Sequence, residues 1–454
     1  MTQARNPRRI CSIKLEPRLG SPYQYKVTKI AIVGSGVAGL AAAWILGERY
    51  NITLFEKKSA LGLGHLSYRV SKEDGGHKID IPPRVINATH YQHLFELIGE
   101  TGLTTYKVRQ QPSFSFKDGQ TYLAFKTYNL FNSSVSLPNF SPVTLRWLLS
   151  HGLELKRWFS FIRSVSTQEL SADVHRQKSK TLSEYLRAKG YSDEFVFGFL
   201  FPMWSLMCTC DYPHVEKFPI VPIIELFRDF TGNASTRRIL GGSEALENKV
   251  RTRIKDAHFE VGVEQLRQSG DKIIVCSELG EQEFDHVIIA TEPTHAKKLA
   301  AAVYPVEHDL IDKIPTYDTH MVMHRDSALM PKNHASWAPV NMFWDPVENK
   351  SSATLWMNQL EAHNDLQNSI FQSWDPIVEP DESLVLARRI FRRSLASTKS
   401  EKATKELRER MTTMGDRRLW FVGSYVSAGI PLLENGVHSA KLVCARILEQ
   451  LNPA

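Results

Sequence analysis

The chain has 454 residues, of which 42% are hydrophobic and 23% are charged. This composition is ordinary for a globular enzyme, and it excludes a disordered, collagen-like or disulfide-stabilised chain. The formal net charge is +7, but residues 1–28 hold six basic residues against one acidic residue, so the rest of the chain is nearly neutral. We therefore expect no nucleic-acid partner, because such a partner requires basic residues gathered on a folded face.

The N-terminal segment and the cysteines bear on localisation. Residues 1–27 contain basic residues but no long apolar run, so we interpret them as a mobile basic leader and not as a secretory signal. The five cysteines are scattered, which favours a reducing, cytoplasmic location. No apolar run approaches the roughly 18–20 residues that span a membrane, so any membrane contact is expected to be peripheral.

The first informative pattern along the chain is a glycine-rich turn between an expected strand at residues 30–33 and an expected helix at 40–46. Gly34, Gly36 and Gly39 follow the spacing GxGxxG, and a second expected strand ends at Glu56. In such a β–α–β unit the glycines allow a tight turn, the approach of a pyrophosphate and close helix packing, while the acid binds ribose hydroxyls. The pattern predicts a dinucleotide site, and Glu56 disfavours NADP because it would repel a 2′-phosphate.

Three later segments add to this unit. Gly62-Leu63-Gly64-His65 follows Glu56 closely, and residues 259–291 alternate in the manner of strands joined by tight turns. Residues 419–448 contain a short expected strand that ends at Gly423, then a loop and a helix with one apolar face.

Together these patterns resemble the flavin-containing amine oxidase and phytoene desaturase superfamily, and especially its branch of predicted FAD/NAD-binding amine-oxidase-like proteins, from about residue 28 onward. The resemblance implies an α/β fold in which a Rossmann-like FAD-binding domain, of the glutathione-reductase and amine-oxidase type, is interleaved with an α+β substrate domain. The FAD-binding domain would comprise residues 28–105, 235–300 and 412–454. Residues 106–234 and 301–411 would form the substrate domain.

The resemblance also implies that FAD is the cofactor. Gly34, Ser35, Gly36 and Gly39 would hold the pyrophosphate, Glu56 the ribose and Val263 the adenine, while Gly436 and Val437 would face the flavin N1–C2=O edge. A helix N-terminus at that edge stabilises the negative charge of reduced flavin. The full set of expected cofactor-binding residues is Gly34, Ser35, Gly36, Ala38, Gly39, Glu56, Lys57, Gly64, His65, Arg84, Val263, Gly423, Ser424, Gly436 and Val437.

The chain departs from the family pattern at several points. Leu63 separates two glycines that are usually adjacent, and Asp80-Ile81-Pro82 stands where the family usually has Asp-Thr-Gly. Ser424 replaces a common Glu, and no lysine can be matched to the one that holds a water near flavin N5 in classical amine oxidases. These departures disfavour amine oxidation, and the sequence assigns no catalytic residue and no metal ligand.

Apolar tracts suggest the substrate. The candidate pocket residues are Trp204, Cys208, Trp337, Trp356, Asn358 and Tyr425, with packing in the core as the alternative. If they line a cavity, the substrate is large and apolar. Residues 141–164 mix aromatic and basic residues, which predicts helices over the substrate domain or, alternatively, a patch that contacts an anionic membrane.

We therefore expect an FAD-dependent oxidoreductase that transfers a hydride from an apolar substrate to flavin N5. The resembling branch includes members that alter acyl chains of lipids, so the leading expectation is desaturation or double-bond isomerisation of a fatty acyl chain. The alternatives are a flavin amine oxidase, a carotenoid or terpenoid desaturase, and a non-catalytic flavin-binding protein. The electron acceptor and the oligomeric state stay open.

Overall fold

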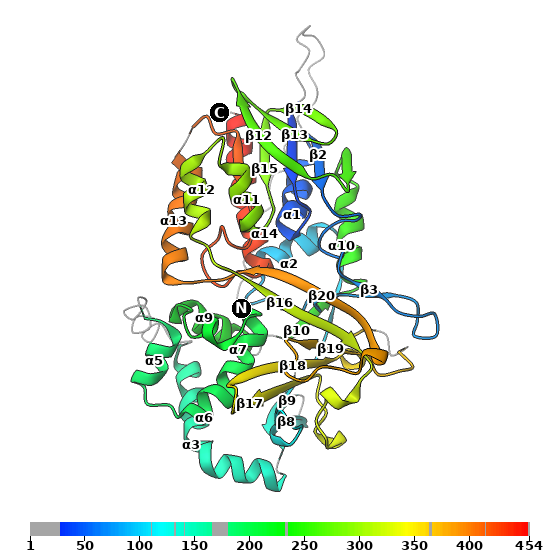
Figure 1. The fold of residues 1–454 in the computed structure, drawn as a ribbon, viewed down its shortest axis with the longest axis vertical. Coiled ribbons are helices and arrows are strands. Elements are labelled where there is room, and N and C mark those ends of the chain that lie inside the picture. The colour runs from blue at the N-terminus through cyan, green and yellow to red at the C-terminus, as the bar shows by residue number, and fades with distance from the viewer. Residues whose placement is uncertain are drawn as a thin grey trace, which may run out of the picture.

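The structure is a computed structural model that describes residues 28–109, 111–130, 133–139, 141–165, 180–231, 235–362, 366–413 and 415–452. The expected leader, residues 1–27, lies outside the described residues. The described chain forms two halves, which lie one above the other in Figure 1.

A five-stranded parallel sheet forms the centre of the upper half. Its order is β11 (Asp256–Phe259), β2 (Asn51–Glu56), β1 (Lys29–Val33), β15 (His286–Ile289) and β21 (Leu419–Phe421). The strands come from the three segments expected to build the FAD-binding domain. Because all five strands run in the same direction, the segments that follow them meet at one edge of the sheet, where nucleotides bind in such folds.

Helices and a small antiparallel sheet surround this central sheet (Figure 1). The helices are α1 (Val37–Leu46), α2 (Gln92–Glu100), α10 (Gly242–Arg251), α11 (Pro293–Ala300), α12 (Pro305–Asp312), α13 (Thr398–Thr413) and α14 (Leu433–Leu451). The small sheet is β12 (Val263–Ser269), β13 (Lys272–Ser277) and β14 (Gly280–Phe284). Helix α14 packs directly on α1, so the two ends of this half of the chain lie side by side.

The lower half combines an eight-stranded sheet with a group of helices. The strand order is β20 (Val385–Ser394), β16 (Thr316–His324), β19 (Phe371–Trp374), β18 (Lys350–Trp356), β17 (Val340–Asp345), β7 (Pro112–Phe116), β8 (Thr121–Leu130) and β9 (Ser133–Pro138). Beside it lie α3 (Pro142–Val165), α5 (Leu182–Ala188), α6 (Asp193–Phe195), a π-helical turn (Val196–Leu200), α7 (Phe201–Cys208), α8 (Tyr212–Val215) and α9 (Ile220–Thr231). Strands β16 and β20 lie where the two halves meet (Figure 1).

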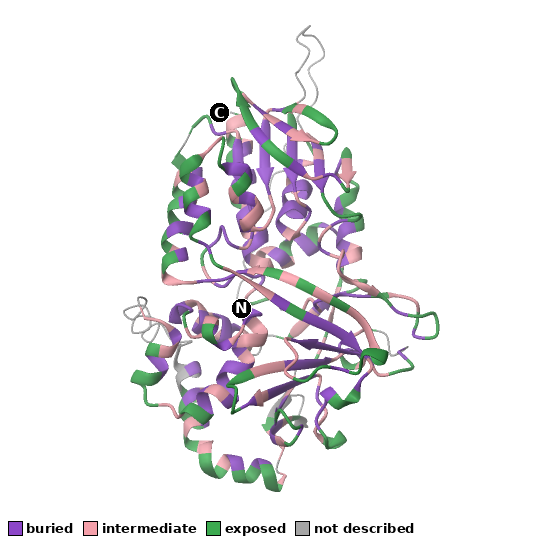
Figure 2. Cartoon of the chain, in the orientation of Figure 1, coloured by how far each residue is buried: buried purple, intermediate pink, exposed green. Residues whose placement is uncertain are grey.

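Two small sheets of short strands lie between the two halves. A three-stranded sheet joins β5 (Ile86–Asn87), β10 (Thr236–Ile239) and β6 (Thr105–Lys107), and β3 (Tyr68–Arg69) pairs with β4 (Lys78–Ile79). The buried residues form a continuous core through both halves, and Figure 2 shows them concentrated in the sheets and the helix faces toward them. No helix among the described residues is long and apolar enough to cross a bilayer.

Candidate functional site

The glycine-rich turn after β1 leaves open space in front of helix α1. Gly34 has φ +100°, and a Cβ on Gly39 would lie only 2.1 Å from the Gly34 carbonyl oxygen, so both positions require glycine. A Cβ on Gly36, by contrast, would meet nothing within 4 Å. Gly36 precedes α1, whose N-terminus carries no side-chain cap. The free N–H groups therefore face unfilled space, as a phosphate-binding site requires.

Glu56 is buried at the end of β2, beside this turn. One of its carboxylate oxygens accepts hydrogen bonds from the Ser35 backbone N–H (2.9 Å) and hydroxyl (2.6 Å), and the other accepts one from the Lys58 N–H (3.0 Å). Gly62 N–H in turn donates to the Ser35 hydroxyl oxygen at 2.7 Å. An ionised carboxylate has about four acceptor positions, so Glu56 can hold this loop in place and still accept from a ribose hydroxyl.

The loop around Gly64 rests on a carboxylate from helix α10. Gly64 N–H donates to Glu247 at 2.6 Å, and a Cβ on residue 64 would lie 2.7 Å from the other carboxylate oxygen. Burial raises the pKa of Glu247 to about 7. Burial also lowers the pKa of the neighbouring His65, and the cation of Lys58 lowers it further.

Arg84 brings a cation to the same loop. Its Nη2 donates to the Leu63 carbonyl at 2.8 Å, and its buried Nε has no hydrogen-bond partner among the described residues. Burial lowers its pKa to about 10, partly offset by the attraction of Asp80. A buried N–H without an acceptor costs free energy. A phosphate or flavin oxygen that bound here would accept its hydrogen bond and remove that cost.

The C-terminal segment completes this edge of the sheet. Gly423 N–H donates to the Ser439 hydroxyl of α14 at 2.9 Å, and the neighbouring Ser424 hydroxyl lies 3.5 Å from that of Ser394. A Cβ on Gly436 would lie 2.8 Å from a methyl group of Val37, so the first turns of α14 and α1 are in contact. Two helix N-termini, each with a partial positive charge, thus lie together.

The remaining expected cofactor residues lie around these contacts. Ala38 and Val437 are buried near the N-termini of α1 and α14. Val263 is buried at the start of β12, whereas Lys57 is exposed directly after Glu56. The structure therefore brings the expected set together along one edge of the parallel sheet, and the residue-level contacts with FAD stay predictions.

A second cluster joins the two halves of the molecule at Arg393. Arg393, near the end of β20, is half-buried. Burial lowers the pKa of its guanidinium, and the nearby Tyr91, Cys208 and Cys210 offset part of that effect. Its charge also lowers the pKa of Arg84. Burial raises the pKa of the Cys208 thiol to about 12 and raises that of Tyr91 as well. Among the described residues the Arg393 guanidinium donates one hydrogen bond, to the Pro431 carbonyl at 3.4 Å, and has no carboxylate partner.

The expected pocket residues do not form one group. Cys208 lies in the cluster around Arg393, whereas Trp204 is fully buried, 5.5 Å from the Trp158 ring, in an aromatic part of the core. Trp337 and Trp356 pack edge to face at 5.3 Å, away from that core. Their assignment to a substrate pocket stays a prediction.

Asn358 and Tyr425 have local roles. The Asn358 side chain binds the backbone of Leu366, Asn368 and Ile370, so its hydrogen-bonding groups hold a turn in place. Tyr425 is buried against Gly423, whose Cβ would lie 2.6 Å from the tyrosine ring. The Tyr425 hydroxyl has no hydrogen-bond partner among the described residues.

Sequence reasoning did not single out Arg393, Tyr91 or Glu247. The sequence does contain a pattern that points to Arg393. Residues alternate between the two faces of a strand, so Arg389, Phe391 and Arg393 lie on one face of β20. Arg389 on this face donates to the Leu66 carbonyl at 3.3 Å. The partners of Tyr91 and Glu247 lie far away in the chain, so no local pattern identifies them.

The described residues contain neither a buried lysine nor a cluster of metal ligands. None of the lysines in the described part of the chain is buried, and three of the four half-buried ones, Lys272, Lys297 and Lys441, pair with carboxylates. His90 and His93 each pair with a carboxylate, Asp229 and Glu434 respectively. Within the described ranges, no three His, Cys, Asp or Glu side chains gather in the manner of a metal site.

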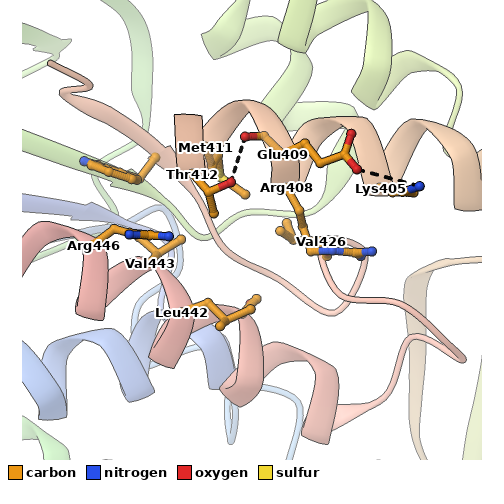
Figure 3. Close-up of a pocket in the computed structure, with 11 residues that line it drawn as sticks. Lys405, Arg408, Glu409, Met411, Thr412, Val426, Leu442, Val443 and Arg446 are labelled. Carbon is orange, nitrogen blue, oxygen red and sulfur yellow. Dashed lines mark hydrogen bonds and ion pairs between the residues drawn. The ribbon is translucent and has the colours of Figure 1, made fainter. Parts of the chain in front are cut away.

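A pocket of about 360 Å³ lies between α13 and α14, on the face of α14 that carries Leu442 and Arg446 (Figure 3). Arg408 lines it and donates to the Val426 carbonyl at 3.0 Å. The glycine turn and the cluster around Arg393 do not contribute to it. None of the expected FAD-binding residues lines the pocket, although Ser439 in its lining accepts the hydrogen bond from Gly423 N–H.

This arrangement fits the class of nucleotide-dependent oxidoreductases, with a candidate nucleotide site at the edge of a parallel sheet and a second half packed against it. The chain belongs to the family described as flavin containing amine oxidoreductase, whose model matches residues 37–323. The comparison with curated proteins gives no significant match. The family assignment confirms the expected superfamily, FAD as the cofactor and the enzyme class.

Solved structures share the fold at low sequence identity. A protein assigned as a protoporphyrinogen oxidase from Exiguobacterium sp. 255-15 aligns with TM-score 0.64 and 16% identity, over 93% of this chain and 99% of that one. Putrescine oxidase with bound putrescine gives 0.59 and 12%, over 93% and 99%. Cyclohexylamine oxidase from Brevibacterium oxydans IH-35A gives 0.59 and 15%, over 94% and 99%. These alignments confirm the predicted fold class.

Proposed function

We propose that this FAD-dependent oxidoreductase acts on a substrate with a long apolar body and an anionic end, of which a fatty acid is the simplest example. The proposed reaction is desaturation or double-bond isomerisation of the acyl chain. The observation that carries the proposal is Arg393, a half-buried cation near Tyr91 and Cys208 that has no carboxylate partner among the described residues.

The charge of this cluster favours an anion over an amine. A protonated amine would be repelled by Arg393 and by Arg84, whose pKa the charge of Arg393 already lowers. A carboxylate would instead form charge-assisted hydrogen bonds with a guanidinium, and it would supply the missing counter-charge.

The surroundings of Arg393 suit an apolar chain. Cys208 ends helix α7, and Trp204 of the same helix packs with Trp158 and Phe227 in the lower half. Tyr91 lies edge to face with Phe230 at 6.2 Å. A carboxylate held at Arg393 therefore has aromatic and aliphatic side chains within the adjoining half of the molecule, as a ligand with an apolar body requires.

Bound FAD supplies a hydride acceptor. In desaturation one carbon would give a hydride to the flavin and the adjacent carbon would release a proton to water as the double bond forms, whereas isomerisation moves a double bond without net oxidation. In this chain Arg393 would fix the carboxylate end. The Tyr91 hydroxyl and the Cys208 thiol stay protonated at neutral pH because burial raises both pKa values, so they can donate hydrogen bonds but do not serve as bases.

An amine oxidase is the second candidate, because similar solved structures include putrescine oxidase and cyclohexylamine oxidase. Identities of 12% and 15% support the fold and leave the substrate open. The absence of a buried lysine among the described residues speaks against the classical amine oxidase site. A carotenoid or terpenoid hydrocarbon has no anionic group, so it would leave the Arg393 guanidinium without a counter-charge.

The test is an anaerobic titration of the yellow holoprotein, followed by the visible flavin band and by product analysis. The probes are oleic acid, its methyl ester, a neutral carotenoid and putrescine. We expect bleaching, or a displaced double bond without bleaching, with the acid, and a weaker effect with the ester because it lacks the negative charge. Bleaching by putrescine alone, or equal responses to acid and ester, would overturn the proposal.

A matched pair of variants isolates the cation. Arg393→Gln should raise the half-saturating concentration of oleic acid about 100-fold, which corresponds to roughly 3 kcal/mol. Arg392→Gln is the control, because Arg392 is exposed on the other face of β20 and pairs with Asp318 at 2.7 Å. A non-catalytic flavoprotein would show no product and no bleaching with any probe.

A further inference from the structure

Helix α3 presents apolar side chains on two faces. Trp147, Leu155, Trp158 and Ile162 are buried and pack against the lower half of the molecule. Leu149 and Leu153 point the other way, with exposed fractions of 89% and 84%. An ordinary amphipathic helix has one apolar face, so the second one needs an explanation of its own.

The exposed face forms a continuous stripe. Leu145, Leu149 and Leu153 are four residues apart, so they follow one line along the helix. We call these three residues the leucine stripe; they extend over about 12 Å at the rise of an α-helix. Exposed apolar residues elsewhere in the described chain, such as Val347 and Ile390, lie on separate elements. Single exposed residues are common, whereas a row of them marks a contact surface.

Basic residues accompany the stripe. Arg146, Lys156 and Arg157 are exposed on the same helix. The helix has one acidic residue, Glu154, and its half-buried carboxylate is occupied by the Ser192 N–H (2.6 Å) and hydroxyl (2.7 Å). The stripe is therefore bordered by cations that suit the phosphates of an anionic lipid surface.

The position of α3 leaves this face accessible. The helix forms the lower end of the molecule in Figure 1, opposite the small sheet β12–β14, and its outer side is largely exposed in Figure 2. Its inner side packs on β8 and α9. A flat surface can therefore approach the stripe without touching the half that fits FAD.

We propose that the leucine stripe of α3 binds peripherally to the surface of an anionic lipid bilayer. The leucines enter the headgroup region, and Arg146 and Lys156 meet the lipid phosphates, whereas the Arg157 guanidinium lies over the Tyr191 ring and donates to the Gly190 carbonyl. This surface is independent of the substrate at Arg393, so either proposal can fail alone.

The test is flotation of the holoprotein with phosphatidylcholine vesicles and with vesicles that contain 30% phosphatidylserine. We expect binding that increases at least tenfold with phosphatidylserine and decreases as salt is added. Leu149→Glu with Leu153→Glu should lower binding more than tenfold. Val347→Glu is the matched control, because Val347 is 87% exposed on the turn between β17 and β18, and it should bind like the wild type.

FAD content and melting temperature establish that each variant is folded. Arg146→Gln with Lys156→Gln should remove the preference for phosphatidylserine and leave residual binding to both vesicle types. A wild type that floats with neither vesicle overturns the proposal. If light scattering instead shows a dimer that the double glutamate variant converts to a monomer, and vesicles are not bound, the stripe is a contact between two copies of this chain.

Discussion

The carboxylate of Glu247 accepts a hydrogen bond from the backbone N–H of Gly64 at 2.6 Å, although the two residues are 183 positions apart in the chain. The contact ties the loop after β2 to helix α10, across the region where the FAD site is expected. A Cβ on residue 64 would lie 2.7 Å from this carboxylate, so any larger residue there requires the Glu247 side chain or the loop to shift.

Gly64→Ala should therefore weaken FAD retention. The added methyl group would lie 2.7 Å from Glu247, so the loop or the carboxylate must shift. We expect at least a tenfold loss of FAD affinity, measured by fluorescence quenching during reconstitution. Gly99→Ala is the control, because a Cβ at that helical position meets nothing within 4 Å, and it should leave affinity unchanged. Equal affinity in both variants would contradict the role of this contact.

Gly36→Val should produce a folded protein without FAD. The structure has no atom within 4 Å of a Cβ on Gly36, so the side chain fits the apoprotein but occupies the place of the pyrophosphate. Circular dichroism should be unchanged and the visible flavin band absent. Gly39→Val should instead prevent folding, because its Cβ would lie 2.1 Å from the Gly34 carbonyl. A Gly36→Val protein that retained FAD, and was therefore yellow, would show that the pyrophosphate does not bind at this turn.

Glu56→Gln should weaken FAD binding by roughly 10- to 100-fold, the effect of losing a charge-assisted hydrogen bond worth about 1.5–3 kcal/mol. Part of this loss of FAD affinity would come from a change in the glycine-rich turn, because Glu56 also accepts hydrogen bonds from Ser35. Ser35→Ala measures that part separately. Glu48→Gln, at an exposed carboxylate that pairs with Arg253, is the control. Unchanged FAD affinity in Glu56→Gln would mean that another group binds the ribose.

His286 should make the fold sensitive to acid. It is fully buried on β15, burial lowers its pKa to about 4, and its Nδ1 accepts from Trp420 Nε1 at 3.2 Å. The unfolded chain binds a proton near pH 6.5, so stability present above that pH is lost as the pH falls toward 4.

The corresponding variant is His286→Asn, which keeps an acceptor for Trp420 but does not titrate. Between pH 6.5 and 4.5 the wild type should lose about 2 kcal/mol more unfolding free energy than this variant, in urea titrations. His334→Asn, at an exposed histidine, should lose as much as the wild type. Equal losses in the wild type and in His286→Asn would show that His286 is not the titrating group.

The sequence by itself determined the nucleotide half of this protein. Gly34, Gly36, Gly39 and Glu56 lie within 23 consecutive residues, because a β–α–β unit is a local structure whose turn, helix and strand leave a readable pattern. The same reasoning predicted a helix at residues 141–164, which the structure has as Pro142–Val165. The mixture of aromatic and basic residues predicted helical structure there, but it did not predict which apolar residues are buried.

Only the tertiary structure decided the remaining relationships. Arg393 meets Tyr91 and Cys208, and Glu247 meets Gly64, because distant segments converge where the two halves join. Trp204 and Leu149 are both apolar, yet one is buried in an aromatic cluster and the other is 89% exposed. Burial and counter-charge depend on what packs against a side chain, and strands and helices far apart in the chain supply those neighbours.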